Sequence, residues 1–143
     1  MRISSQGLAL IERYEGFSSH AYICPAGVLT IGYGHVLLPY EFYPDGINAE
    51  LARLLLTRDV HKAQSAVIRF IDVPLTQAQF DALVSFTFNV GAAALQRSTL
   101  RQVINRAEHT QAPRQFLRWV RSNGRILAGL VARRQAEAIL YLS

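Results

Sequence analysis

Residues 21–35 are the one stretch of this 143-residue chain whose pattern favours a β-hairpin over a helix. Two short runs with β-branched and aromatic residues flank a Pro-Ala-Gly turn at residues 25–27, which is typical of a hairpin. A three-residue loop pairs Tyr22 with Thr30. Alternation then places Cys24 on the same face as Thr30, about 7 Å away as a diagonal neighbour. The rest of the chain must therefore pack with a small antiparallel sheet.

The segments on both sides of the hairpin have helical patterns. Ser4 or Ser5 can cap a first helix that ends near Glu15. Residues 48–70 predict a connecting helix roughly 33 Å long, and residues 76–79 form a capping box. Further helices are expected over residues 77–88, 98–104, 113–120 and 127–141. We therefore predict an α+β fold with a small N-terminal lobe that carries the hairpin sheet, a long connecting helix and a helical C-terminal lobe.

The size and composition of the chain suit one folded domain, residues 1–143. Hydrophobic residues make up 50% and charged residues 17%, which excludes a disordered chain. We expect two lobes, roughly residues 13–60 and residues 1–12 together with 61–143.

Cys24 is the one cysteine, so no internal disulfide can form. The apolar stretches are shorter than the roughly 18 residues of a membrane span. The first residues lack the apolar core of a signal peptide, so we expect synthesis and folding in a cytoplasm.

The net charge of +5 is unevenly distributed. From Arg97 onward nine arginines oppose two glutamates, a local net charge of +7, whereas the first 96 residues carry −2. A basic half indicates an anionic partner, such as a cell-surface polymer, a nucleic acid or a membrane face. A solvated helical surface would have the same composition, so charge alone leaves these alternatives open.

Glu15 is the strongest candidate for chemistry. It ends the first helix on the same stripe as Leu8 and Ile11. The negative end of the helix dipole and apolar neighbours both favour a protonated carboxyl. That is the form able to protonate a glycosidic oxygen. Cys24 and Thr30 face the same way on the hairpin, where a thiol and a hydroxyl could hold a water on the opposite side of a bound sugar.

The spacing of Glu15, Cys24 and Thr30 resembles the signature of the phage-type lysozymes, a family of muramidases. That signature is a Glu, eight residues, an Asp or Cys, five residues and a Thr. Other segments are also similar to family motifs: Glu15-Gly16-Phe17, Ala21-Tyr22, and residues 27–35, 79–91, 98–100 and 129–134. The resemblance covers nearly the whole chain and implies a lysozyme-like fold.

The resemblance also implies an activity. The enzyme would hydrolyse the β-1,4 bond between N-acetylmuramic acid and N-acetylglucosamine in bacterial peptidoglycan, without a cofactor or metal. Glu15 would be the general acid, and Cys24 and Thr30 would position the water of an inverting mechanism. Asn89 and Ser98 would bind saccharide, although an amide or hydroxyl at these positions could instead cap local backbone. A neutral thiol would supply no negative charge, so Cys24 either has a depressed pKa or mainly positions water.

Two further contacts are implied by the resemblance. His35 could act as an acid–base group, but the resemblance favours a structural ion pair with Asp59, with a raised pKa of the imidazole. Arg133 or Arg134 would lie near Glu15.

Partners and location follow from the same resemblance. The protein would be a monomer whose partner is bacterial peptidoglycan and not a nucleic acid. It would stay in the host cytoplasm until lysis, when a partner such as a phage holin would give it access to the periplasm and cell wall.

Three other hypotheses about function are compatible with the sequence. The chain could be a peptidoglycan-binding module whose catalysis is impaired by the cysteine at position 24. Its arginine-rich half could bind nucleic acid, although no nucleic-acid motif is present. It could also be a lytic transglycosylase, which needs no hydrolytic water.

Overall fold

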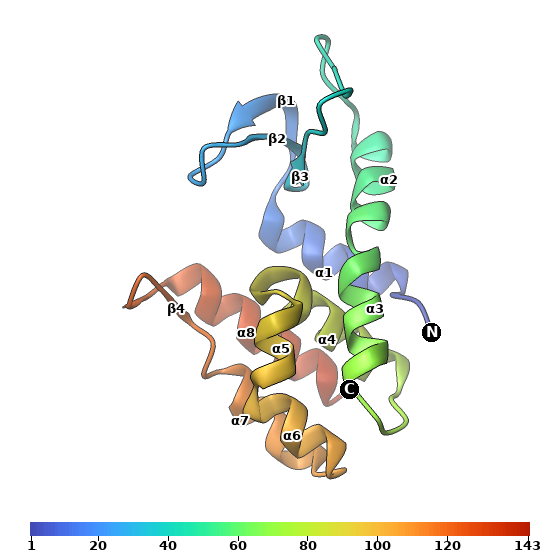
Figure 1. The fold of residues 1–143 in the computed structure, drawn as a ribbon, viewed down its shortest axis with the longest axis vertical. Coiled ribbons are helices and arrows are strands. Elements are labelled where there is room, and N and C mark those ends of the chain that lie inside the picture. The colour runs from blue at the N-terminus through green and yellow to red at the C-terminus, as the bar shows by residue number, and fades with distance from the viewer. The chain divides into compact units, whose positions relative to one another are not determined.

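A computed structural model describes all of residues 1–143 and confirms the α+β class (Figure 1). The α-helices are α1 (Ser5–Glu15), α2 (Ala49–Asp59), α3 (His61–Phe70), α4 (Gln77–Val90), α5 (Ala92–Arg97), α6 (Thr99–Asn105), α7 (Ala112–Phe116) and α8 (Ala128–Tyr141). A 3₁₀ helix, η1, covers His109–Gln111. The strands are β1 (Ser18–Ile23), β2 (Leu29–Gly32), β3 (His35–Val36), β4 (Arg121–Ser122) and β5 (Arg125–Ile126).

The chain divides into two compact units, which we name the sheet unit and the helical unit. The sheet unit is Ile11–His61, and the helical unit combines Met1–Leu10 with Lys62–Ser143. Helix α1 contributes residues to both units. No helix of the fold combines the length and the apolar character that crossing a membrane requires.

The sheet unit is built on an antiparallel sheet with the strand order β1-β2-β3. Tyr22 pairs with Thr30, which confirms the register predicted from the loop length. The Cys24 amide donates to the Val28 carbonyl at 3.0 Å and closes the hairpin. Gly27 takes up the left-handed backbone of the turn, with φ of 83°.

Helix α2 packs on this sheet (Figure 1). Its buried Ala52 and Leu55 form a core with Ile31 and Ile47. A Cβ on Gly32 would come within 3.1 Å of the Ala52 Cβ. The glycine therefore lets the helix approach the strand closely.

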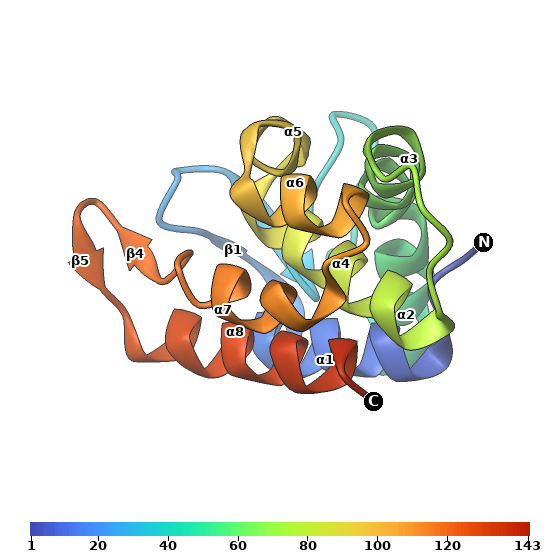
Figure 2. The same cartoon turned by 90° about the horizontal axis from the view of Figure 1, so that it is seen from below.

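The helical unit is organised around α4, which packs against α8, while α8 also packs against α7 (Figure 2). Every residue of α4 from Phe80 to Thr87 is buried. Such a helix, apolar on most of its surface, needs neighbours on several sides. The predicted capping box is confirmed, because Thr76 and Gln79 each bond the backbone of the other.

Several features differ from the sequence expectation. The connecting helix is interrupted at Val60, although the Val60 amide still donates to the Leu56 carbonyl at 2.9 Å. Helix α5 was not expected, and α7 ends at Phe116 instead of Val120. Strands β4 and β5 were also missed. Their turn is Asn123-Gly124, where both residues have positive φ, as in a two-residue hairpin turn.

Candidate active site

Glu15 is the last residue of α1 and is partly buried. Gly16 then leaves the helix with φ of 73°. The Glu15 carboxyl lies against Gly34 in the turn between β2 and β3, since a Cβ on Gly34 would fall 2.7 Å from Glu15 Oε1. Gly34 also has φ of 76°. Glycine is therefore required at position 34 both for its backbone and for the space that the carboxyl occupies.

The last turn of α1 is tied to α2 by an ion pair. Arg53 Nε donates to Glu12 Oε1 at 2.6 Å. Burial, together with the nearby Glu12 carboxylate, raises the pKa of Tyr33. Glu12 lies one turn before Glu15, so this contact helps to fix the helix end that carries Glu15. This pair could not be predicted from the sequence, because its partners are 41 residues apart.

Cys24 and Thr30 lie on the β1–β2 hairpin of the same unit. The Thr30 side chain is buried, and its hydroxyl donates to the Val28 carbonyl at 3.1 Å. Hydrogen bonding from the Val28 backbone, and next from the Thr30 side chain, lowers the pKa of the Cys24 thiol and outweighs the opposing effect of burial. In the sheet unit, the Glu15 carboxyl therefore lies against the β2–β3 turn, and the Cys24 thiol, whose pKa is lowered, lies on the β1–β2 hairpin.

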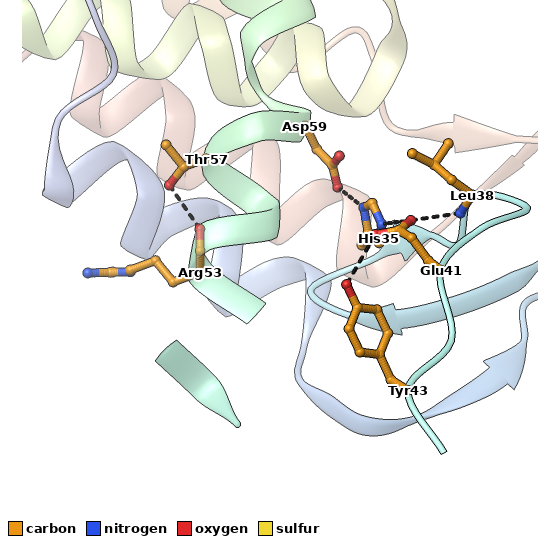
Figure 3. A network of polar contacts seen from close by, with 7 residues as sticks. All are labelled: His35, Leu38, Glu41, Tyr43, Arg53, Thr57 and Asp59. Atoms are coloured by element: carbon orange, nitrogen blue, oxygen red, sulfur yellow. Dashed lines mark hydrogen bonds and ion pairs between the residues drawn. The ribbon is translucent and has the colours of Figure 1, made fainter. Parts of the chain in front are cut away.

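His35 is buried between two carboxylates (Figure 3). Its Nδ1 lies 2.7 Å from Asp59 Oδ2, and its Nε2 lies 2.8 Å from Glu41 Oε1. Ionised carboxylates only accept, so both ring nitrogens must carry a proton. Burial opposes this charge, but the hydrogen bonds and charges of Glu41 and Asp59 outweigh it and raise the pKa of His35. The predicted pair with Asp59 is confirmed, and the raised pKa is the direction that the sequence predicts.

Glu41 is the part of this cluster that sequence reasoning missed. It lies in the loop after β3, where its Oε1 also accepts from the Leu38 amide at 2.7 Å and its Oε2 from the Tyr43 hydroxyl at 3.2 Å (Figure 3). Although burial opposes ionisation, these hydrogen bonds and the His35 charge lower the pKa of Glu41. The cluster therefore fastens the loop to the sheet and to α2.

In the helical unit, the two predicted saccharide-binding residues have different surroundings. Asn89 is exposed near the end of α4, and its Oδ1 accepts from Arg134 Nη2 at 2.7 Å. Ser98 is buried and caps α6. Its hydroxyl donates to the Leu95 carbonyl at 2.8 Å and accepts from the Arg101 amide at 3.0 Å. The one proton of the Ser98 hydroxyl is therefore used in a hydrogen bond to the backbone.

Arg134 belongs to a buried network between α8 and α4. Arg134 Nε lies 2.7 Å from Glu137 Oε1, Arg133 Nε lies 3.4 Å from Glu137 Oε2, and the Ser85 hydroxyl donates to that same oxygen at 2.5 Å. The Arg134 guanidinium also stacks over the Phe86 ring at 5.1 Å. Burial raises the pKa of Glu137 and lowers that of Arg134, and the opposite charges partly offset it.

Two cavities open on the helical unit. The larger, about 420 Å³, is lined by residues that include Asn89, Arg121 and Ser122. The smaller, about 290 Å³, includes Ser98. Arg97, Arg118 and Trp119 line both. The chain contains no group of three or more His, Cys, Asp or Glu side chains arranged to hold a metal ion.

The fold and comparisons with known proteins define the class as a lysozyme-type enzyme. Residues 12–137 match the family described as phage lysozyme, and the chain belongs to that family. It is 41% identical to an endolysin of Acyrthosiphon pisum secondary endosymbiont phage 1, covering 100% of this chain and 99% of that one. It is also 41% identical to the endolysin of Bacillus phage B103, where it covers 100% of this chain but only 55% of the longer relative.

Solved structures agree with this assignment. An endolysin from Escherichia coli O157:H7 phage FAHEc1 matches with a TM-score of 0.91 and 37% identity, covering 100% of this chain and 94% of that one. The muramidase domain of SpmX from Asticcacaulis excentricus matches with a TM-score of 0.90 and 38% identity, covering 99% and 98%. The lysozyme-like fold is therefore established.

Proposed function

We propose that this protein is an endolysin that hydrolyses the β-1,4 bond between N-acetylmuramic acid and N-acetylglucosamine in bacterial peptidoglycan, with inversion at the sugar carbon. One observation carries the proposal: the same unit holds the Glu15 carboxyl against Gly34 and, on the β1–β2 hairpin, Cys24 with its hydrogen bond to Thr30. A carboxylic acid and a separate water-holding pair are the two components that an inverting glycosidase needs.

Glu15 is the proposed general acid. It transfers its proton to the glycosidic oxygen as the bond from that oxygen to the sugar carbon breaks. Gly34 supports this role, because its lack of a side chain leaves the carboxyl room beside the turn, while the Glu12–Arg53 pair holds the helix end.

Cys24 and Thr30 are proposed to orient the attacking water. The Thr30 hydroxyl lies within hydrogen-bond reach of both the Val28 carbonyl and Cys24, and its oxygen can accept a hydrogen bond from water whichever of the two receives its proton. A Cys24 thiolate, favoured by its lowered pKa, accepts the other water hydrogen. As the water oxygen bonds to the sugar carbon, its proton passes to the thiolate.

Asn89 and Ser98 are proposed to contact saccharide from the helical unit. Asn89 is the better supported, since its amide nitrogen remains available as a donor while its oxygen accepts from Arg134. Ser98 lines the smaller cavity, but its hydroxyl can offer only a remaining lone pair.

Location and partners are proposed on the same basis. Several relatives are endolysins of phages, and the phage Mu relative, at 34% identity, is named a SAR-endolysin. We infer a monomeric enzyme that waits in the host cytoplasm and reaches the periplasm and wall at lysis, through a partner such as a holin.

Mass spectrometry of digested peptidoglycan tests this function. Wild type should release fragments with reducing N-acetylmuramic acid ends, and Glu15→Gln should release none. Anhydro ends would instead indicate a lytic transglycosylase. Binding of the wall by both proteins without cleavage would indicate the impaired binding module.

A further inference from the structure

The loop between β3 and α2 carries exposed apolar side chains that the proposed hydrolysis does not use. We name residues 37–43 the apolar loop. Phe42 is 81% exposed, Tyr40 is 77% exposed and Leu38 is 39% exposed. Figure 1 shows this segment extending away from the strands of the sheet unit before it turns back to α2. We propose that the apolar loop binds the surface of a lipid bilayer, with these three side chains inserted among the lipids.

The backbone of the apolar loop separates its side chains into an inward and an outward set. Leu37 and Tyr43, at the two ends of the loop, pack against the core of the sheet unit. Glu41 is directed inward to His35. The three exposed side chains occupy positions between these residues. The loop therefore places its carboxylate inside and its apolar groups outside, the reverse of the usual arrangement in water.

Hydrogen bonds hold the outward side chains in place. Glu41 Oε1 accepts from the Leu38 amide at 2.7 Å, and the Glu41 amide donates to the Leu38 carbonyl at 2.9 Å. Pro39 is the second residue of this four-residue turn, where its fixed φ suits the backbone. Beyond the loop, the Gly46 amide donates to the Tyr43 carbonyl at 3.0 Å. Because the loop is fastened at its ends and its centre, its apolar side chains stay available to a partner.

The charge of the loop suits insertion among lipids. The sequence has no Lys, Arg, Asp or Glu between Glu15 and Glu41, and the Glu41 side chain is only 6% exposed. Insertion therefore removes no exposed charge from water, a step that would oppose binding. A phenylalanine ring suits the acyl boundary of a bilayer, and a tyrosine ring with its hydroxyl suits the headgroup level. Phe42 and Tyr40 supply one of each.

The size of the surface favours a bilayer over a second copy of the chain. From their exposed fractions, the three side chains offer roughly 400 Å². A stable dimer buries about 800 Å² on each partner and needs shape complementarity. A projecting loop with three side chains provides neither. Shallow insertion into a bilayer needs only apolar area, because lipids close around the inserted groups.

Sedimentation with vesicles tests the inference. Vesicles of pure phosphatidylcholine carry no net charge, so the binding of wild type should survive high salt. Tyr40→Ser combined with Phe42→Ser should bind at least tenfold more weakly, because it removes most of the apolar area. Leu54→Ser combined with Ile68→Ser is the matched control, since both side chains are apolar and 58% exposed, on α2 and α3. The control variant should bind as wild type does.

Tryptophan fluorescence locates the inserted segment. Trp119 is the one tryptophan of the chain, so Trp119→Phe combined with Phe42→Trp moves the single indole to the apolar loop. Vesicles whose acyl chains carry bromine should quench its emission. They should quench the emission of wild-type Trp119 much less.

Four results would overturn the inference: no binding to phosphatidylcholine vesicles, equal losses in the two serine double variants, binding that requires anionic lipids and is abolished by salt, or a concentration-dependent dimer that the loop variant abolishes. The third result would assign membrane binding to the basic half of the chain, and the fourth would make a second copy the partner. The inference goes beyond the proposed hydrolysis, which is judged separately by the cleavage of peptidoglycan.

Discussion

Gly34 controls the space around the Glu15 carboxyl, and this contact can be tested with a single methyl group. In Gly34→Ala, the new Cβ would meet Glu15 Oε1 at 2.7 Å. We expect peptidoglycan hydrolysis to fall about tenfold or more, because small displacements of a catalytic group are costly. The left-handed backbone adds about 1–2 kcal/mol of strain to the folded state. Initial rates and a urea denaturation curve measure the two effects.

Gly16→Ala is the matched control for that substitution. Gly16 has a similar positive φ of 73°, but a Cβ there would meet nothing within 4 Å. It should lose comparable stability and keep more activity. Equal activity losses in the two variants would show that backbone strain, and not the contact with Glu15, is responsible.

The lowered pKa of Cys24 predicts sensitivity to peroxide. A thiolate is oxidised more readily than a thiol, so mild peroxide should inactivate the enzyme and a reducing agent should restore it. Cys24→Asp should remain active and resist peroxide, since the family signature accepts Asp at this position. Mass spectrometry would verify the oxidation. Full activity of the verified sulfenic form would contradict the proposed role of Cys24.

At the level of elements, the loop after β3 should be held in a pH-dependent way. The pKa of His35 is raised on folding. Its contribution to stability is therefore complete below its unfolded value of about 6.5, and it is lost as the pH rises through the folded pKa. Glu41 has a lowered pKa, so its contribution is present above about pH 4.3 and is lost as the pH falls. The two groups together stabilise the loop most between about pH 4.3 and about pH 6.5.

His35→Gln isolates this effect. Its loss of unfolding free energy, about 1–3 kcal/mol for removing charged hydrogen bonds, should be largest near pH 5.5 and shrink toward pH 9. Urea denaturation across this range measures it. His61→Gln, at an exposed histidine that begins α3, should show no such trend. A constant loss for His35→Gln at every pH would contradict the charged cluster.

The contact between α4 and α8 depends on charge balance around Glu137. In Glu137→Gln, Arg133 and Arg134 remain buried without that carboxylate. We expect a loss of about 3–5 kcal/mol in unfolding free energy, as for removing one partner of a buried pair. Chemical denaturation measures it. Glu108→Gln makes the same change at the exposed Arg106 pair and should have a much smaller effect. Similar losses would refute the importance of burial.

Across the whole molecule, the features readable from sequence are those encoded by near neighbours in the chain. The hairpin register follows from its loop length, and the start of α4 follows from its capping box. The elements that were missed are short. Helix α5 has six residues and β4 has two, too few to generate a periodic pattern. The Asn123-Gly124 turn was a usable signal for the β4–β5 hairpin.

Some residues of the candidate site can likewise be predicted from the sequence, and others cannot. Glu15, Cys24 and Thr30 lie within 16 residues of chain, so their spacing is visible in the sequence. The contact of Gly34 with Glu15, the second carboxylate on His35 and the arginine-lined cavity depend on backbone paths that a spacing pattern does not encode. The roles of these residues follow only from the folded structure.

The helical unit is completed by α8, which is synthesised after the other elements of that unit. Its first ten residues precede the sheet unit, and α8 ends at Tyr141. A ribosome can therefore release a contiguous sheet unit early, whereas α4 must wait for α8 to cover its apolar surface. A message truncated before α8 would also leave Asn89 without Arg134. Incomplete translation should thus yield a chain that is insoluble or degraded, and not a partly active wall hydrolase.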